Sequence, residues 1–589
     1  MPTRLTLAGA AFLLALLSGG AAAASDPSYE GSQDAPTFQP GSVDERVEIP
    51  GEIAIDLRDD ISEADLSAVA SRYGVAMRPN SAWGSAHDKI EVAEVDPGRE
   101  EELLSALARD PRVEHAEPMA LYRALFVPDD PLYATKQWHL KRVGAERAWD
   151  YTCGEGVTVA VVDTGVACFD KGPFSRGTDL AGTRCLGGWN FVDDSPEAVD
   201  DQGHGTHVAG TIAQTTNNGV GAAGLAYCAT LMPVKVLNKQ GFGTVASVAE
   251  GIRFAADEGA RVINLSLGGP IKSSLIGDAI AHALSRNVVI VAAAGNSGGS
   301  VGWPAAYPGV IAVSATDADD KIAWFSSRGP EVDIAAPGVG VTQQTICNGG
   351  RDRCEIFGTF NGTSMASPHV AGVAAMIEAV GVTRAQAVAD VLASTARGQG
   401  DPKLYGAGIV DAGAAMAKVF WGRLAVRSSF VAVFLWLVGR RVRQRGGRLV
   451  RSPVAGLATL FASIGLFPVG PFAHVSSISM DGVAGSLARL GVRPFGEWDL
   501  ALAGPTVASF WLFGSALPVL ALAALGFANR RARPMIGGFA LGTAAFLAQR
   551  VWSAEVAFVL GVGLSRVWAV GNIALCLWVA RVGLEGKRA

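Results

Sequence analysis

The sequence has no excess of positive charge. Its 589 residues include 49 lysines and arginines against 55 aspartates and glutamates, which gives a net charge of -6 at pH 7. A surface that binds nucleic acid needs clustered positive charge, usually with interleaved aromatic side chains, and the sequence contains no such stripe. The composition therefore argues against nucleic acid as a partner.

No cysteine follows the apolar leader at the N-terminus, which argues against a lipoprotein anchor. Residues 1–24 contain a basic Arg4, an apolar core from about Leu5 to Leu17, and Ala22, Ala23 and Ala24 directly before Ser25. This pattern is typical of a signal peptide with a small-residue cleavage site, and its apolar core is too short to span a bilayer. The sequence predicts a cleaved signal peptide over residues 1–24 and a Pro-, Ser-, Asp- and Gly-rich linker over residues 25–44.

Cysteine is scarce in the sequence as a whole, with seven in total. Six of them lie between residues 153 and 354, and the other, Cys576, lies in an apolar segment. An even number of cysteines within an exported domain fits disulfide bonds. The expected pairs are, in order of preference, Cys347 with Cys354, which bracket one loop, Cys168 with Cys185, and, by elimination, Cys153 with Cys228.

A serine stands at the start of a predicted helix in the segment Gly-Thr-Ser-Met-Ala-Ser-Pro, residues 362–368. The Gly-Thr turn leads into an apolar, small-residue helix from about Ser364 to Ala379. The aligned peptide dipoles of such a helix place partial positive charge and free N–H groups beside the serine, where they would stabilise an oxyanion. Taken alone, the segment fits either a nucleophile or a helix cap.

Two upstream segments supply what a serine nucleophile requires. The β-branched run 157–162 predicts a buried parallel strand, and Asp163 follows it at the edge where α/β sheets carry their sites. In Gly-His-Gly-Thr-His, residues 203–207, flanking glycines present His204 at the start of another helix. A serine needs a base to remove its proton, and the base needs a carboxylate to fix its tautomer. Each residue taken singly also fits a capping role.

With these three motifs in the order Asp, His, Ser, the chain resembles the subtilisin-like serine proteases, or subtilases, over about residues 130–418. The resemblance implies that Asp163 orients the histidine, that His204 is general base and then general acid, and that Ser364 is the nucleophile. It also matches Asn296, which follows an apolar run, to the family's oxyanion-stabilising amide. The implied fold of residues 125–418 is α/β, a doubly wound and mostly parallel sheet.

The resemblance also implies a substrate cleft. One segment of the cleft lies antiparallel to the substrate backbone in this family, so that peptides bind by strand addition. Small residues and the absence of an acidic group in these motifs favour apolar or aromatic side chains before the scissile bond. The implied residues are Ser266, Leu267 and Gly268 for the antiparallel segment, Gly241, Phe242 and Gly243 for the opposite wall, and Ala293, Ala294 and Gly295 for the pocket.

A small α+β domain is predicted upstream, over residues 45–124. Strands are expected at Glu52–Leu57 and Lys89–Val95, helices at Glu63–Tyr73, behind a Ser62 cap, and at Arg99–Arg109, and an extended tail at Val113–Pro118. The pattern resembles the inhibitory propeptide of subtilases, which is a folding template and places its C-terminal strand in the cleft. A binding module retained in the mature protein is the alternative, and residues 130–140 favour the propeptide because they resemble a mature N-terminus.

A calcium site is a further implication of the resemblance. Residues 215–222, Thr-Thr-Asn-Asn-Gly-Val-Gly-Ala, resemble the cation loop of the family, and Asp179 matches the carboxylate that completes the site. Carbonyl, amide and carboxylate oxygens suit Ca²⁺, which would hold the loop rather than do chemistry. An Asn-Gly turn without an ion is the alternative. The implied ligands are Asp179, Thr216, Asn218, Val220 and Ala222.

Charged residues become sparse after Lys418, and long apolar stretches recur. The stretches are 420–439, 454–474, 502–528, 535–548 and 556–582. Several are long enough to cross a bilayer, and arginines cluster at 440–451 and 530–533. The positive-inside rule places both clusters in the cytoplasm and the upstream domain outside. Residues 419–589 are therefore predicted to form about five transmembrane helices in contact with lipid.

Two classes of function fit these features. The first is an exported, membrane-anchored serine endopeptidase that acts on polypeptides and on its own propeptide. The second is a membrane transport, sensor or scaffold protein whose protease-like domain only binds peptides. The complete set of Asp163, His204, Ser364 and Asn296 favours the first class.

Overall fold

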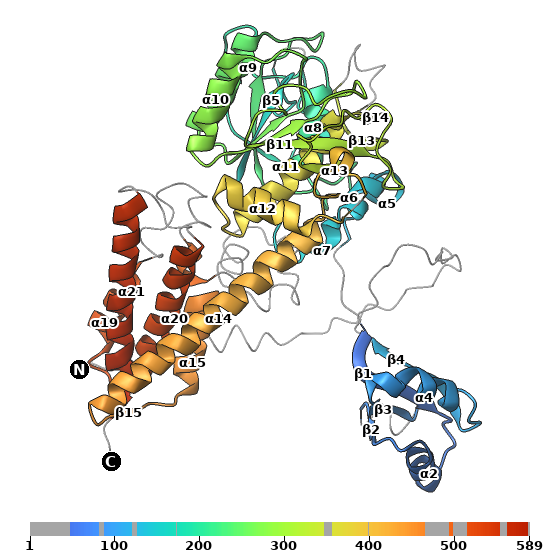
Figure 1. The fold of residues 1–589 in the computed structure, drawn as a ribbon, viewed down its shortest axis with the longest axis vertical. Coiled ribbons are helices and arrows are strands. Elements are labelled where there is room, and N and C mark those ends of the chain that lie inside the picture. The colour runs from blue at the N-terminus through green and yellow to red at the C-terminus, as the bar shows by residue number, and fades with distance from the viewer. Residues whose placement is uncertain are drawn as a thin grey trace. The chain divides into compact units, whose positions relative to one another are not determined.

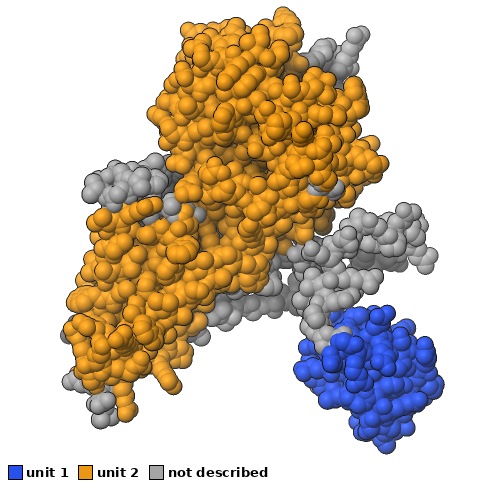
Figure 2. Space-filling view, viewed as in Figure 1, with its two compact units in different colours: residues 1–123 blue, residues 124–589 orange. Residues whose placement is uncertain are grey.

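The computed structural model describes residues 48–81, 88–120, 127–171, 174–346, 356–398, 400–465, 494–498, 515–553 and 562–586. The predicted signal peptide, the linker and the Cys347–Cys354 pair lie outside these residues. The chain divides into two compact units, residues 1–123 and 124–589 (Figure 2).

The first unit is an antiparallel sheet with two helices. Its strand order is β2-β3-β1-β4, formed by β1 (Glu48–Leu57), β2 (Met77–Pro79), β3 (Ile90–Glu94) and β4 (Val113–Ala120). The helices are α2 (Glu63–Tyr73), capped by the side chain of Ser62, and α4 (Glu100–Leu107). Alternate residues of β1, namely Ile53, Ile55 and Leu57, are fully buried and share a core with Leu103 and Leu107.

The second unit contains an eight-stranded sheet whose recorded pairings are all parallel. The strand order is β12-β11-β10-β9-β5-β8-β6, with β7 beside β8. The strands are β5 (Thr158–Asp163), β6 (Arg184–Cys185), β7 (Trp189–Asn190), β8 (Thr230–Lys235), β9 (Val262–Leu265), β10 (Val289–Ala293), β11 (Val310–Thr316) and β12 (Ile334–Pro337). Every residue of β9, β10 and β11 is buried, which explains their continuous apolar sequences.

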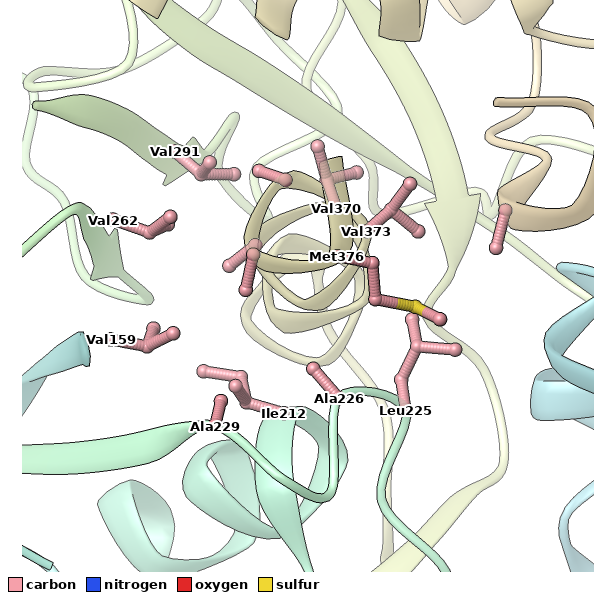
Figure 3. Packing of buried hydrophobic residues seen from close by; sticks show 14 of the residues in the cluster. Val159, Ile212, Leu225, Ala226, Ala229, Val262, Val291, Val370, Val373 and Met376 are labelled. Atoms are coloured by element: carbon pink, nitrogen blue, oxygen red, sulfur yellow. The ribbon is translucent and has the colours of Figure 1, made fainter. Parts of the chain in front are cut away.

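Helices cover both faces of this sheet, so the predicted doubly wound α/β fold is confirmed (Figure 1). One face packs against α8 (His204–Ala213), α11 (Thr363–Ala379) and α12 (Ala385–Thr395), and the other against α9 (Val245–Asp257) and α10 (Ser274–Ser285). In the first layer, Val159, Val262 and Val291 of the strands lie along one side of α11, whose Val370 and Met376 belong to the same core (Figure 3). This packing fixes the helix that begins at the candidate nucleophile.

Two of the predicted disulfides are present. Cys153 bonds to Cys228, and Cys168 bonds to Cys185. The first joins the segments that lead into the neighbouring strands β5 and β8, and Cys576 is a buried free cysteine. These bonds confirm the prediction that cysteines of the second unit form disulfides.

The C-terminal region is a helical bundle. Its helices are α14 (Ala412–Gln444), α15 (Pro453–Ile464), α19 (Leu517–Gly526), α20 (Arg533–Trp552) and α21 (Val562–Leu584). Glycines allow close approach to α20, because a Cβ atom at Gly538 would lie 2.1 Å from the carbonyl oxygen of Ala455. Within the described residues, two helices are long and apolar enough to cross a membrane by length and composition, Ala412–Gln444 and Ser565–Leu584. Three of the predicted spans lie partly outside the described residues, so their number stays a prediction.

Candidate active site

Asp163 and His204 meet at the carboxyl edge of the sheet. Asp163 is the last residue of β5 and fully buried, and His204 is the first residue of α8. The Nδ1–H of His204 donates to Oδ1 of Asp163 over 2.8 Å. The two loops touch at a glycine, because a Cβ atom at Gly205 would lie 2.1 Å from the carbonyl oxygen of Gly165. Gly205, which follows His204, is therefore required for this close approach.

The surroundings of His204 favour its protonated form. Burial by itself lowers the pKa of the imidazole, but the charge and hydrogen bond of Asp163, with the charge of Asp200, outweigh it and raise the pKa above the usual value. A histidine with a raised pKa is a stronger base and remains able to return its proton near neutral pH.

Ser364 lies in the first turn of α11 and is held by Ser266. The hydroxyl of Ser364 donates to the carbonyl oxygen of Ser266 over 3.1 Å, and the hydroxyl of Ser266 donates back to the carbonyl oxygen of Ser364 over 2.7 Å. No hydrogen bond joins Ser364 to His204 in the part of the chain that the structure describes. Catalytic hydrogen bonds are often incomplete without substrate, and a χ1 rotation redirects the serine hydroxyl.

Asn296 follows β10 and is oriented by the residue before the serine. Its Oδ1 accepts from the backbone N–H and from the hydroxyl of Thr363, each over 2.9 Å. With Oδ1 occupied in this way, the Nδ2 group is the free donor of the amide. A Cβ atom at Gly362 would lie 3.4 Å from Nδ2, so glycine leaves this donor open.

The predicted cleft residues follow the ends of three strands. Leu267 and Gly268 continue from β9, and Ala294 and Gly295 continue from Ala293, the last residue of β10. Phe242, after β8, is 74% exposed, as expected for a side chain on a cleft wall. Ala293 and Ala294 are buried, and the backbone N–H of Ser327 donates to the carbonyl oxygen of Gly295 over 2.8 Å. The side chain of Ser266, in contrast, contacts Ser364 itself.

Sequence reasoning missed Asp200, which joins the two loops of the site. Its buried carboxylate accepts from the hydroxyl of Thr164 over 2.9 Å and from the hydroxyl of Thr206 over 2.6 Å. It also accepts from the backbone N–H groups of Gln202, Gly203 and Thr206. The position of Asp200, in Asp-Asp-Gln-Gly-His, was the available signal, since a carboxylate before a glycine turn is a natural acceptor for its N–H groups.

The predicted cation loop wraps around Asp179. This carboxylate is fully buried and accepts from Nδ2 of Asn218 and from the backbone N–H of Ala222, each over 2.8 Å. Burial, with a contribution from the charge of Asp130, raises the pKa of Asp179 to about 6. Oδ1 of Asp130 is buried and has no hydrogen-bond partner within the described residues. Two buried carboxylates that disfavour each other's charge fit a cation, although the described residues contain no cluster of three or more His, Cys, Asp or Glu side chains able to hold a metal.

Three further histidines are buried near the site. Nδ1–H of His369 donates to the carbonyl oxygen of Met365, so its Nε2 accepts from Nδ1–H of His139 over 2.8 Å. His207 stacks on Phe360, with ring centroids 4.3 Å apart. Burial lowers the pKa of all three, of His207 to about 3 and of His369 to about 4. These histidines are neutral packing residues at neutral pH.

A parallel sheet with a histidine-carboxylate pair at its edge and a serine on the adjoining helix start defines a serine protease of the subtilisin type. The family model described as "Subtilase family" matches residues 154–408. Thermitase of Thermoactinomyces vulgaris is 42% identical over 257 residues, which are 44% of this chain and 87% of the relative. Subtilisin Savinase of Lederbergia lenta is 43% identical over 281 residues, or 47% of this chain and 97% of the relative. A thermophilic serine proteinase of Bacillus sp. (strain AK1) is 37% identical over 335 residues, or 56% and 79%. The chain belongs to the subtilase family, and its substrates are polypeptides.

Proposed function

We propose that this chain is an exported, membrane-anchored serine endopeptidase in which Asp163, His204 and Ser364 form the catalytic triad and Asn296 stabilises the oxyanion. The observation that carries the proposal is the 2.8 Å hydrogen bond between the buried Asp163 and His204, at the sheet edge where α11 begins. The orientation of Asn296 by Thr363 supports the oxyanion role, since it leaves Nδ2 as the donor.

The reaction follows from these positions. Oγ of Ser364 attacks the scissile carbonyl carbon while Nε2 of His204 takes its proton, and Asp163 stabilises the imidazolium that forms. The oxyanion accepts from Nδ2 of Asn296 and from the N-terminal turn of α11. His204 then gives its proton to the leaving amine, and a water molecule activated by His204 hydrolyses the acyl-enzyme. The bond between Ser364 and Ser266 opens at the first step.

Substrate binding uses main chain before side chains. A peptide in extended form pairs antiparallel with Ser266–Gly268 and is covered on the other side by Gly241–Gly243. The pocket at Ala293–Gly295 takes the side chain before the scissile bond. The exposed ring of Phe242 supports an apolar contact at the opposite wall.

A structural Ca²⁺ is part of the proposal. Its ligands are the Asp179 carboxylate, the Asn218 amide oxygen and the carbonyl oxygens of Thr216, Val220 and Ala222. The buried, unpartnered Oδ1 of Asp130 supports a cation at this loop and adds a residue to the predicted set. The ion would hold the loop and take no part in the reaction.

The first unit is proposed as the enzyme's own propeptide. It has a small sheet and core of its own, and the catalytic unit begins after residue 123. An independently cored unit ahead of a catalytic unit suits a segment that is cleaved off and binds as a separate inhibitor. Its removal is expected to use the same Ser364 as any other substrate.

Membrane anchoring rests on the C-terminal helices and their arginines. The exposed arginines at 440–451 and 530–533 are expected to stay in the cytoplasm, because each costs about 2.5–3.5 kcal/mol at mid-bilayer on insertion scales. Helix α14 would then run inward from an extracytoplasmic catalytic domain. The predicted signal peptide and the two disulfides support the same side.

A fluorophosphonate probe tests the enzymatic assignment. The probe is expected to label the wild type and to fail on Ser364→Ala, whose precursor should also keep its first unit. A peptide-binding scaffold would leave both proteins unlabelled. Labelling of Ser364→Ala at another serine would refute the triad assignment.

A further inference from the structure

Helix α14 belongs to the catalytic core and to the helical bundle at once. It runs without a break for 33 residues, from Ala412 to Gln444 (Figure 1). In its first turns, Ala415, Met416 and Val419 are buried in the core that contains α11. In its last turns, Val438 and Val442 are buried in the bundle. No flexible linker therefore separates the catalytic domain from the proposed membrane region.

Two tryptophans mark where α14 meets the bilayer surfaces. Trp421 and Trp436 are each 55% exposed, and they lie about 22 Å apart along the helix at 1.5 Å per residue. Tryptophan prefers the two interfaces of a membrane. Between the two tryptophans, α14 exposes Val433 and Leu435 and buries Arg423 and Arg427, which both lie near Glu497, and further arginines follow Trp436. Trp421 directly follows Phe420, whose ring lies 5.3 Å from that of Tyr151 in the catalytic domain. The outer interface therefore begins where the catalytic core ends.

The length of helix α11 sets an upper limit on the height of the active site above this interface. The guanidinium of Arg423, one half-turn beyond Trp421, donates to the carbonyl oxygen of Val380 at the C-terminal cap of α11. Arg423 also lies 3.7 Å from Glu497. Ser364 stands at the other end of α11, about 24 Å away along a straight helix. The cleft is thus held at most about 24 Å above the level of Arg423, by a helix rather than by a tether.

We infer that the substrates of this enzyme are membrane-held proteins, cut in an extended segment that leaves the same face of the bilayer close to its surface. The inference rests on the proposed function and adds a substrate class to it. An extended chain rises about 3.3 Å per residue, so at most about seven residues are needed to reach the cleft from the interface. Substrates held in the same membrane as the enzyme also meet it at a higher effective concentration than substrates free in solution.

The test uses the full-length enzyme in phosphatidylcholine vesicles with single-span substrates. Each substrate carries the same cleavable peptide at about 2, about 10 or about 60 Gly/Ser residues from its span. The middle substrate is expected to be cut about tenfold faster than the most distant one, whose effective concentration at the cleft falls as the linker grows. Equal rates for the three would overturn the inference.

A matched variant separates the effect of rigidity from that of catalysis. Insertion of about 20 Gly/Ser residues between Trp421 and Gly422 converts the helical connection into a flexible one. The variant should cut the free peptide at the wild-type rate and lose the distance preference. If the insertion also abolishes cleavage of the free peptide, the variant is inactive, and the rates of the wild type on the three membrane substrates test the inference on their own. If Ser364→Ala cuts the free peptide as fast as the wild type does, the proposed function itself is refuted.

Discussion

Thr363 fixes Asn296 by two hydrogen bonds to one oxygen, from its backbone N–H and from its hydroxyl. Because Thr363 directly precedes Ser364, the nucleophile and the proposed oxyanion donor are bound to each other through one residue. The hydroxyl of Thr363 also accepts from the backbone N–H of Gly295 over 3.1 Å. The proposed oxyanion donor is therefore oriented before a substrate arrives.

Asn296→Ala should lower kcat by roughly 10²–10³, the loss measured at the corresponding amide of subtilisin, with little change in KM. The reason is that the lost hydrogen bond forms mainly in the transition state. Steady-state kinetics on a chromogenic peptide measure kcat and KM separately. Thr363→Val, which keeps the shape and removes the hydroxyl, should lose about 3–10-fold in kcat, whereas Thr363→Ser should stay near wild type. A rise in KM alone would make Asn296 a substrate-binding residue.

Asp200→Asn should move the acidic limb of the kcat/KM profile to lower pH. The charge of Asp200 helps to raise the pKa of His204, and His204 must be neutral to act as base. Removing that charge lowers the pKa, so the base stays neutral at more acidic pH. Asp201→Asn is the matched control, since Asp201 pairs with Lys235 over 2.6 Å. A lower kcat with no shift in the acidic limb of the kcat/KM profile would mean that Asp200 acts only through its hydrogen bonds.

The elements that carry the site were predictable because their sequence signals are local. The strand before Asp163 and the helix after Ser364 follow from continuous apolar runs and a glycine turn, and both are found within a residue of the expected bounds. The network of Asp200 depends on side chains from loops distant in sequence, which no local pattern reports. The hydrogen bond from Ser364 to Ser266 is a rotamer choice, which the sequence does not encode locally.

The continuity of α14 is also beyond local reasoning. Apolar content rises after Lys418, which predicts a domain boundary there. The predicted boundary falls inside α14, where Val419 and Phe420 are buried. Burial of these residues follows from tertiary contacts with the catalytic domain, such as that of Phe420 with Tyr151.

Removal of calcium should make Asp179 a source of instability at neutral pH. The raised pKa means that folding disfavours its charge, so without a cation its contribution to stability improves as pH falls from above 6 toward 4. Asp179→Asn should therefore be more stable than the wild type at pH 7 in a chelator, with the difference shrinking toward pH 5. Added Ca²⁺ should raise the Tm of the wild type and not that of the variant. Equal responses to Ca²⁺ would place the ion elsewhere.

The buried histidines should make the protein sensitive to acid. The pKa values of His139, His207 and His369 are lowered by folding, so below about pH 6.5 the unfolded chain binds protons that the folded chain does not. Stability should fall as pH drops from about 6.5 toward 4. The urea midpoint of His139→Asn should fall less steeply with decreasing pH than that of the wild type, because unfolding of the variant takes up to one proton fewer. Parallel curves for variant and wild type would show that His139 does not titrate on unfolding.

Cysteine labelling tests the proposed topology. In a Cys576→Ala background, Arg443→Cys should resist an impermeant maleimide in intact cells and react after permeabilisation. Lys239→Cys, exposed on the catalytic domain, should react in both cases. The opposite pattern would reverse the topology, and with it the claim that cleavage happens outside the cytoplasm.

Helix α14 is buried at its start in the core around α11 and at its end in the helical bundle, and this arrangement sets the order in which the protein folds and inserts. The core around α11 lacks Ala415, Met416 and Val419 until the ribosome has made the start of α14, the first proposed membrane helix. Translation proceeds from the N-terminus and domains tend to fold as they emerge, so the catalytic core is completed only as that helix becomes available for insertion. With the proposed anchoring, the newly made enzyme is held in the membrane by the time its fold closes, and an untethered active form would have to arise by later cleavage within α14.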